Sequence, residues 1–262
     1  MNVVSLGFRT DLMLLELGGS VVIDRSTHMV VRTPQSPDFW WGNFLLLASP
    51  LREGEAEHWT GEFAEHFPDV THFALGVDGT DGEAGDAAEL AALGTTLETS
   101  AVLTAEEMAA PDRLPPGVDV RPLSGDDDWR QADELRWESV ESGSSNPAHR
   151  AYVTGRQEEY RRLCEEGYGA WFGAFVDGRM RAGTGVFTDG SGLARFQNVH
   201  THPDLRRQGL ASAVVRHAGH WALTELRATT LVIVAGGQQA VALYEKLGFA
   251  ETERQVQLAR PA

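Results

Sequence analysis

Residues 199–212 decide the fold, and they read Val199-His200-Thr201-His202-Pro203-Asp204-Leu205-Arg206-Arg207-Gln208-Gly209-Leu210-Ala211-Ser212. The run at 194–199 predicts a strand. A proline and a basic turn follow it, and a helical pattern starts at Gly209. Glycine and small residues at the start of a helix leave backbone N–H groups unpaired and approachable. These donors, the helix dipole and the two arginines predict an anion site, suited above all to phosphate.

Length and composition limit the protein class. The 262 residues, 42% of them hydrophobic, can form one large domain or two of ordinary size. The formal net charge of −16 argues against nucleic acid or an anionic membrane surface as the main partner. Cys164 is the only cysteine, so it allows no intrachain disulfide or cysteine-based zinc site, and its helical context favours a buried filler over a nucleophile. The run Leu12–Leu17 is too short and too polar for a signal peptide or spanning helix, so we expect a cytoplasmic protein.

Three prolines and a glycine at 111–117 mark the domain boundary, because neither a helix nor a central strand continues through them. We expect a first domain at 1–110, a linker at 111–117 and a second domain at 118–262. Strand and helix patterns alternate in both, which predicts an α/β fold. The expected strands are at 39–47, 70–77, 95–103, 118–123, 194–201, 229–235 and 249–258, with hairpins at 20–33 and 169–188. The expected helices are at 54–67, 84–93, 126–140, 148–165, 209–226 and 238–247.

The two halves share an order of elements. Strand, helix, strand, helix and strand follow one another in two stretches of equal length, 39–103 and 194–258. Residue identities hardly match, so the repeat is one of architecture. Where the second half carries its basic turn, the first half has Glu53 and Glu55 on either side of Gly54. Carboxylates repel phosphate, so we expect the first half to have lost its anion site.

Two motifs in the second half add a family resemblance. Arg206, Gly209 and Ala211 fit the pattern Arg/Gln-x-x-Gly-x-Gly/Ala, and the second motif reads Ala240-Val241-Ala242-Leu243-Tyr244-Glu245-Lys246-Leu247-Gly248-Phe249. In these motifs, over residues 118–258, the chain resembles the GNAT acetyltransferase family. The resemblance implies a mixed, mainly antiparallel twisted sheet flanked by helices, in tandem with a degenerate, GNAT-like first copy at 1–110. It also implies acetyl-CoA as co-substrate and no metal.

The resemblance assigns roles to individual residues. Backbone groups of Val199, His200 and Thr201 would hold the pantetheine arm. Tyr244 stands where the family commonly keeps a general acid. Many members have an asparagine seven residues before that tyrosine; here the position is Gly237, and a neighbouring glutamine is the candidate to replace it. The pyrophosphate would lie on the N–H groups of the turn and helix start, namely Arg206, Arg207, Gln208, Gly209, Leu210, Ala211 and Ser212.

Candidates for the remaining chemistry are open. His200 and His202 alternate along the predicted strand and so share one face, where either could relay a proton; the alternative is a solvent-facing or hydrogen-bonded histidine. Glu138 and Glu141 lie one helical turn apart and would draw a cationic amine, or form a solvated face. Two further features favour packing over chemistry: the histidine pair His217 and His220, for which no third metal ligand is evident, and the cluster Phe39-Trp40-Trp41.

We therefore expect an N-acetyltransferase that moves an acetyl group from acetyl-CoA to a primary amine by direct attack in a ternary complex. Tyr244 and His200 are the expected catalytic residues. The acceptor is a small-molecule or peptide amine, nucleic acid and membrane are not partners, and a homodimer is compatible with the sequence. Two alternatives stay open: a non-catalytic acyl-CoA-binding or regulatory module, and a tandem enzyme in which both halves bind CoA.

Overall fold

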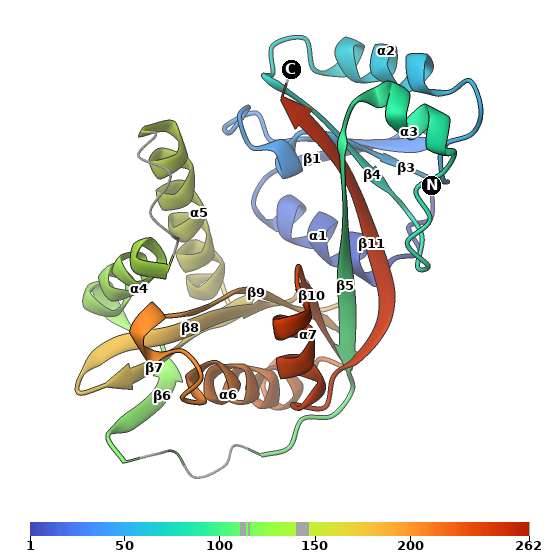
Figure 1. Ribbon diagram of the computed structural model, residues 1–262. Helices are drawn as coiled ribbons and strands as arrows, with labels where there is room; N and C mark the ends of the chain where they lie inside the picture. The colour runs from blue at the N-terminus through green and yellow to red at the C-terminus, as the bar shows by residue number, and fades with distance from the viewer. Residues whose placement is uncertain (111–113, 115, 140–146, 262) are drawn as a thin grey trace. The chain divides into compact units, whose positions relative to one another are not determined.

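A computed structural model describes residues 1–110, 114, 116–139 and 147–261, and its fold is mixed α/β (Figure 1). The chain forms two compact units. The first consists of Met1–Leu103, Val234–Val241 and Glu251–Ala262, and the second of Thr104–Ile233 and Ala242–Ala250. These units differ from the expected division into 1–110 and 118–262, because the last strand belongs to the first unit. The expected linker at 111–117 lies partly outside the described residues.

The first unit is built on a sheet whose strands follow the order β1-β2-β3-β4-β11-β5. The pairs β1/β2, β2/β3 and β4/β11 are antiparallel, whereas β3 and β4 are parallel and are joined through α2. Its elements are α1 (Leu6–Leu17), β1 (Val21–Asp24), β2 (His28–Arg32), η1 (Trp40–Gly42), β3 (Phe44–Leu47), α2 (Ala56–His66), β4 (His72–Val77), α3 (Ala87–Leu93), β5 (Thr96–Ala105) and β11 (Ala250–Pro261).

Strand β3 shows how the sheet of the first unit is covered on both faces. All four of its residues are buried, as a strand between two helical layers requires. Phe44 and Leu46 join the cluster of α1, which includes Phe8 and Leu12. The alternate residues, 45 and 47, join the cluster of α2, which includes Trp59 and Phe63. The period of two therefore splits one apolar run between two cores.

The second unit has the strand order β6-β7-β8-β9-β10. The strands β6 to β9 pair antiparallel, and β9 pairs parallel with β10 through the crossover helix α6. The Asp177-Gly178 turn of the β7–β8 hairpin has positive φ at both residues, as the sequence predicts for such a turn. The elements are β6 (Val118–Pro122), α4 (Gly125–Ser139), α5 (Pro147–Glu165), β7 (Gly169–Val176), β8 (Arg179–Phe187), β9 (Leu193–Thr201), η2 (Pro203–Leu205), α6 (Leu210–Thr224), β10 (Thr230–Ala235) and α7 (Gln238–Glu245).

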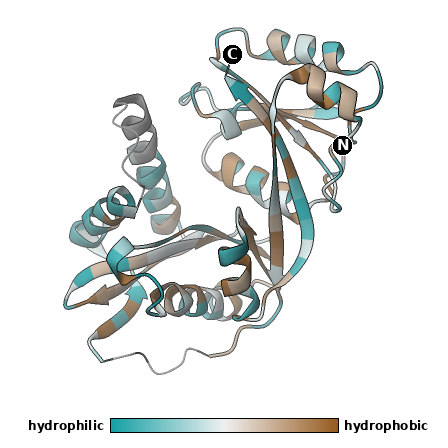
Figure 2. Cartoon of the chain, viewed as in Figure 1, coloured by the Kyte–Doolittle hydropathy of each residue, from teal (hydrophilic) through white to brown (hydrophobic). Residues whose placement is uncertain are grey.

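Helices cover both faces of the second sheet as well. Helix α6 lies beneath β7 and β8 in Figure 1, and its residues Leu210 and Val214 pack against two alanines of these strands. Helices α4 and α5 lie on the opposite face. There the ring of Tyr160 from α5 stacks on Phe187 of β8, with 5.3 Å between ring centroids, and also contacts Trp171 of β7. Figure 2 shows hydrophobic residues along the strands and a largely hydrophilic α4.

The expected repeat is present in the order of elements. Segments β3–α2–β4–α3–β5 and β9–α6–β10–α7–β11 each contain a parallel strand pair joined by a helix; we call them the first and second repeat. The last strand of the second repeat pairs with the first: β11 lies antiparallel to β4, with Val256 opposite Val77 and Pro261 opposite His72. The predicted mainly antiparallel sheet flanked by helices is confirmed.

Two departures from the expected elements have local causes. Helix α1 is not among the predicted elements; it starts at Ser5, whose side chain accepts the N–H of Phe8 as a helix cap. The predicted strand at 39–47 is a 3-10 turn followed by a short strand, because the Asn43 amide donates to the carbonyls of Ser36 and Phe39 and closes a loop there. Among the helices of the described residues, none has the length and apolar run needed to cross a membrane.

Candidate functional site

Strand β9 leaves its parallel neighbour partway along its length. It pairs with β10 only from Leu193 to Arg195, while its pairing with β8 continues to Thr201. Between these points β9 carries a bulge, since Gly183 lies opposite His200 but Gly185 lies opposite Gln197, and Asn198 has a φ of +52°. A bulge leaves a residue outside the ladder and twists the strand. On the β10 side the described ladder therefore ends before residues 196–201, which include Val199, His200 and Thr201, the residues expected to hold the pantetheine arm.

The turn after β9 connects this strand to the start of α6. His202 caps η2 by accepting the N–H of Asp204, and Arg207 and Gly209 follow with φ of +62° and +83°. Gly209 is the N-cap of α6 and offers no side-chain oxygen, and the first bond of the helix runs from the Ala213 N–H to the Gly209 carbonyl. The N–H groups of the first helical turn thus have no partner in the helix. Left-handed residues beside a helix start make a concave, anion-binding backbone.

Charge around this turn is positive against an acidic background. Arg206, Arg207 and Gln208 are exposed. The Arg206 guanidinium lies 3.5 Å from the Ser139 carbonyl at the end of α4, and the Gln208 amide 3.5 Å from the Asp204 carbonyl. Leu210 is buried and anchors the helix start in the core, so the donors are presented on a fixed scaffold. The residues predicted to bind the anion thus form an exposed turn at 206–209 and the first turn of α6, where Leu210 is buried.

Tyr244 reaches the same strand through a shared aromatic neighbour. Its ring contacts Phe249 at 6.2 Å between centroids, and Phe249 in turn meets Phe196 of β9 edge-on at 5.8 Å. Phe196 is the residue at which β9 leaves β10. The hydroxyl makes no hydrogen bond to any residue that the structure describes, and burial raises the pKa of Tyr244 to about 12. The phenol therefore keeps its proton throughout the physiological range.

His200 lies toward α4 and is a poor proton acceptor. Burial, with a smaller contribution from the charge of Arg136 on α4, lowers the pKa of His200 to about 4. Its Nε2 is buried without a hydrogen-bond partner among the described residues. Nε2 is therefore neither solvent-facing nor hydrogen-bonded to a described residue, while the residue as a whole is partly exposed. At neutral pH the imidazole is uncharged and weakly basic.

His202 and Glu138 form a second contact between the turn and α4. Nε2 of His202 is 3.5 Å from Glu138 Oε2, and its Nδ1 accepts the Asp204 N–H. His202 therefore holds the turn in place, which the sequence pattern did not indicate. Glu138 is half exposed, and Glu141, its expected partner, lies outside the described residues.

A polar cluster beside the bulge was missed by sequence reasoning. The hydroxyl of Tyr160 on α5 accepts from Arg156 at 2.8 Å and lies 3.4 Å from Gln197 Oε1 and 3.5 Å from the Asn198 amide. On α4, burial raises the pKa of the half-buried Asp133 carboxyl. A carboxyl whose pKa is raised by burial is a candidate for a functional site. Asn198 is the sequence signal that could have pointed to the bulge, because asparagine tolerates the left-handed conformation that it adopts here.

The first repeat keeps the turn but fills the helix start with its own carboxylates. Gly54 has a φ of +83°, the same value as Gly209. At the start of α2, however, the Ala56 N–H donates to Glu89 Oε2 at 2.7 Å, and the Glu55 carboxylate accepts the Arg52 N–H at 2.9 Å. These side chains take the place that an anionic ligand would need. That the first half lacks an anion site stays a prediction.

The remaining candidates are accounted for by packing. Nδ1 of His217 lies 2.7 Å from the Ala213 carbonyl of its own helix. Trp40 stacks on His72, and Trp41 meets Phe44 edge-on, so the aromatic cluster packs within the first unit. Burial raises the pKa of the Cys164 thiol to about 12, which removes it as a nucleophile at neutral pH.

Comparisons with known proteins agree with this geometry. The model of the acetyltransferase (GNAT) family matches residues 129–249. A comparison with curated proteins gave no match. Among solved structures, a GCN5-related N-acetyltransferase from Kribbella flavida is 19% identical with a TM-score of 0.66, over 98% of this chain and 96% of that one. A functionally unknown conserved protein from Staphylococcus epidermidis is 12% identical, with a TM-score of 0.69 over 92% and 94%.

A third similar structure bears on the two repeats. It is a tandem GNAT protein from the clavulanic acid biosynthesis pathway, 16% identical, with a TM-score of 0.58 over 95% of this chain and 87% of that one. At these identities the likeness shows the fold, and it extends over nearly the whole chain rather than the second half alone. The family match covers α6, the turn before it and Tyr244. Residues 129–249 therefore match the acetyltransferase (GNAT) family, and this match lies almost wholly within the second unit.

Proposed function

We propose that the second repeat transfers an acetyl group from acetyl-CoA to a primary amine by direct attack in a ternary complex. One observation carries the proposal: β9 separates from β10 after Arg195 and leads directly to the uncapped start of α6. An extended ligand with an anionic end matches this arrangement. Its amides would pair with the free edge of β9, and its pyrophosphate would lie on the turn at 206–212.

The reaction needs alignment more than activation. The amine nitrogen attacks the thioester carbonyl carbon, the carbon–sulfur bond breaks, and the products are an amide and the free thiol of CoA. Holding both reactants in place removes most of the entropic barrier. A free N–H near Val199, on the β10 side of the strand, would stabilise the oxyanion that forms during attack.

Tyr244 would act on the leaving group. An alkyl thiol has a pKa of roughly 8.5, several units below the pKa of about 12 for Tyr244. Complete transfer of the phenolic proton to the thiolate is therefore uphill. We expect the hydroxyl to donate a hydrogen bond to the developing thiolate, and the proton lost by the amine to restore the thiol.

The pKa of His200 is too low for this residue to take the proton from the acceptor amine, which is the relay role expected of it. A primary ammonium has a pKa near 10, and the pKa of His200 is about 4. Transfer between them would cost roughly 8 kcal/mol, at 1.36 kcal/mol for each pKa unit. We infer that the neutral imidazole positions a ligand instead. The proton would leave through water or through Asp133, whose pKa is raised on the same side of the sheet.

The acceptor is proposed as a small-molecule or peptide amine. Glu138, half exposed beside the turn, would attract its positive charge. The acidic net charge of −16 opposes nucleic acid or an anionic membrane as a partner. The turn, β9 and Tyr244 all come from one chain, so a second copy is not needed to complete the proposed site. A homodimer is therefore compatible with the proposed function.

The rival function is a non-catalytic acyl-CoA-binding module. Gly237 favours it, since this position supplies only a carbonyl to α7 and no side-chain amide for the ligand. An assay of free thiol release with a panel of amines separates the two functions. We expect turnover with at least one amine, a fall of about 100-fold in kcat for Tyr244→Phe, and no change for Tyr168→Phe, an exposed tyrosine. Tight CoA binding without turnover for any amine would favour the rival.

A further inference from the structure

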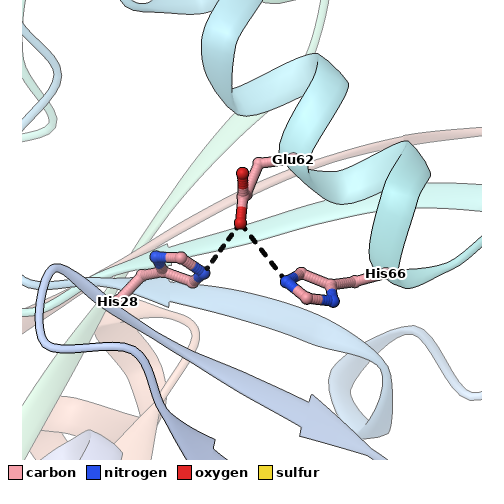
Figure 3. Close-up of side chains that lie close together, drawn as sticks. All are labelled: His28, Glu62 and His66. Carbon is pink, nitrogen blue, oxygen red and sulfur yellow. Dashed lines mark ion pairs between the residues drawn. The ribbon is translucent and has the colours of Figure 1, made fainter.

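Three potential metal ligands converge within the first unit. Glu62 and His66 lie one turn apart on the same face of α2, and His28 lies on β2. One carboxylate oxygen, Glu62 Oε1, is 3.5 Å from His28 Nε2 and 3.3 Å from His66 Nε2. Figure 3 shows this oxygen facing a ring nitrogen of each histidine. The three ligand atoms all lie within 4.8 Å of one another.

One ring nitrogen of the buried His28 lacks the hydrogen bond that a buried polar atom normally makes. His28 is only 4% exposed, and its Nε2 has no hydrogen-bond partner among the described residues. Its Nδ1 lies 3.2 Å from the Thr27 hydroxyl. If Nδ1 donates to that hydroxyl, the lone pair of Nε2 points at a carboxylate, which is repulsive unless a cation lies between them. Buried polar atoms without partners are rare and call for an explanation.

The distances fit a metal better than direct hydrogen bonds. A good hydrogen bond between a ring nitrogen and a carboxylate is about 2.7–3.2 Å long. Ligands about 2.0–2.1 Å from a tetrahedral zinc ion lie roughly 3.3–3.4 Å apart. The separations of Glu62 Oε1 from the two nitrogens match this edge. The two histidine nitrogens would need to approach by side-chain rotation.

We propose that His28, Glu62 and His66 bind one divalent transition-metal ion, with zinc as the best fit. Two imidazoles and a carboxylate are the ligand set that zinc accepts, and they are too rich in nitrogen for Ca²⁺ or Mg²⁺. The fourth position would hold water. A surface hollow of about 590 Å³ adjoins Glu62 along α2 and supplies access; it is lined by Gly54, Glu57, His58, Gly61, Glu62 and Glu65.

One neighbour adjusts when the metal binds. The Arg32 guanidinium donates to the His66 carbonyl at 2.7 Å and lies 3.4 Å from His66 Nδ1. Metal on Nε2 requires the proton on Nδ1, so this longer contact would open while the shorter one is kept. This site departs from the expectation of a metal-free protein, and it ties β2 to α2 independently of acetyl transfer.

Zinc binding to the full chain tests the proposal. The protein is stripped with a chelator and titrated with Zn²⁺ by calorimetry, and with Co²⁺ to record the absorption of a four-coordinate site. We expect one ion per chain, and Glu62→Gln and His66→Gln should each weaken binding by more than about 10-fold, the loss typical of outer-sphere partners alone. His220→Gln, a helical histidine of the second unit, is the matched control and should bind normally.

The opposing results are equally defined. No binding near one equivalent would mean that a shared proton alone holds the three side chains. Binding that survives both ligand substitutions would place the metal elsewhere. Circular dichroism of the metal-free variants checks that they fold, since both substituted side chains are partly buried.

Discussion

Gly209→Ala offers the sharpest perturbation of the turn before α6. Gly209 has a φ of +83°, and a Cβ added there would meet no atom within 4 Å. The substitution therefore introduces backbone strain without a steric clash. An alanine held in the left-handed region costs about 1–2 kcal/mol. If the free turn relaxes to relieve that strain and CoA requires the original shape, the affinity for CoA falls by about 5–30-fold.

The first repeat provides a matched control for this substitution. Gly54 has the same φ of +83°, and a Cβ added at Gly54 would likewise meet no atom within 4 Å. Gly54→Ala should therefore cost similar conformational strain, but its helix start is already occupied by Glu89 and Glu55. We expect its affinity for CoA to equal that of the unmodified chain.

Calorimetric titration with CoA and urea unfolding together read both effects. The reasoning predicts weaker binding for Gly209→Ala alone and comparable losses of stability for both variants. Equal CoA affinity for Gly209→Ala and the unmodified chain would refute the role of the turn. An equal loss of affinity in both variants would show that the effect is one of general stability.

Three further predictions concern single side chains. For Tyr244→Phe we expect the affinity for CoA to stay within about twofold while kcat falls about 100-fold; a large rise in Kd would mean that the ring, not the hydroxyl, is what matters. For His200, whose pKa is lowered from 6.5 to about 4, the unfolded chain binds a proton over this range that the folded chain does not. The contribution of His200 to the free energy of unfolding is then fully present above pH 6.5 and falls by up to about 3 kcal/mol as the pH drops toward 4. Urea unfolding of His200→Gln should lack this pH dependence. An unchanged pH dependence would contradict the low pKa assigned to His200. Glu89→Gln weakens the charged bond to the Ala56 N–H, so we expect a loss of about 1 kcal/mol in urea unfolding and no added CoA site; unchanged stability would show that this contact contributes nothing.

Local features of the fold follow from the sequence because their causes are local. The Asp177-Gly178 pair has the backbone conformation of a tight hairpin. Gly248 takes the left-handed conformation, with φ of +99°, just after α7. Glycines 54 and 209 have equal φ, although Gly209 is the N-cap of α6 and Gly54 lies one residue before Glu55, the N-cap of α2. Turn chemistry and hydrophobic periodicity need only neighbours in the chain.

Strand pairing and burial depend on residues far apart in sequence, so the sequence pattern could not supply them. Periodicity places a side chain on a face but does not choose the partner strand. The pairing of β11 with β4, and the separation of β9 from β10, are choices of this kind. The period of two assigns His200 to one face of its strand, but its low pKa comes from burial and from Arg136 on another helix.

The same limit applies to the lost anion site of the first repeat. Glu53 and Glu55 are visible in the sequence as an unfavourable charge next to Gly54. The carboxylate that caps the Ala56 N–H belongs to Glu89, which α3 brings back to the start of α2. Sequence reasoning based its expectation on the nearer carboxylates, and the structure adds a distant one.

The number of CoA molecules bound per chain tests the central claim most directly. Calorimetric titration of the full chain with CoA should give one site, with an affinity that Gly209→Ala weakens and Gly54→Ala leaves unchanged. Two sites per chain, or a single site that responds to Gly54→Ala instead, would contradict the account in which only the second repeat keeps a working turn.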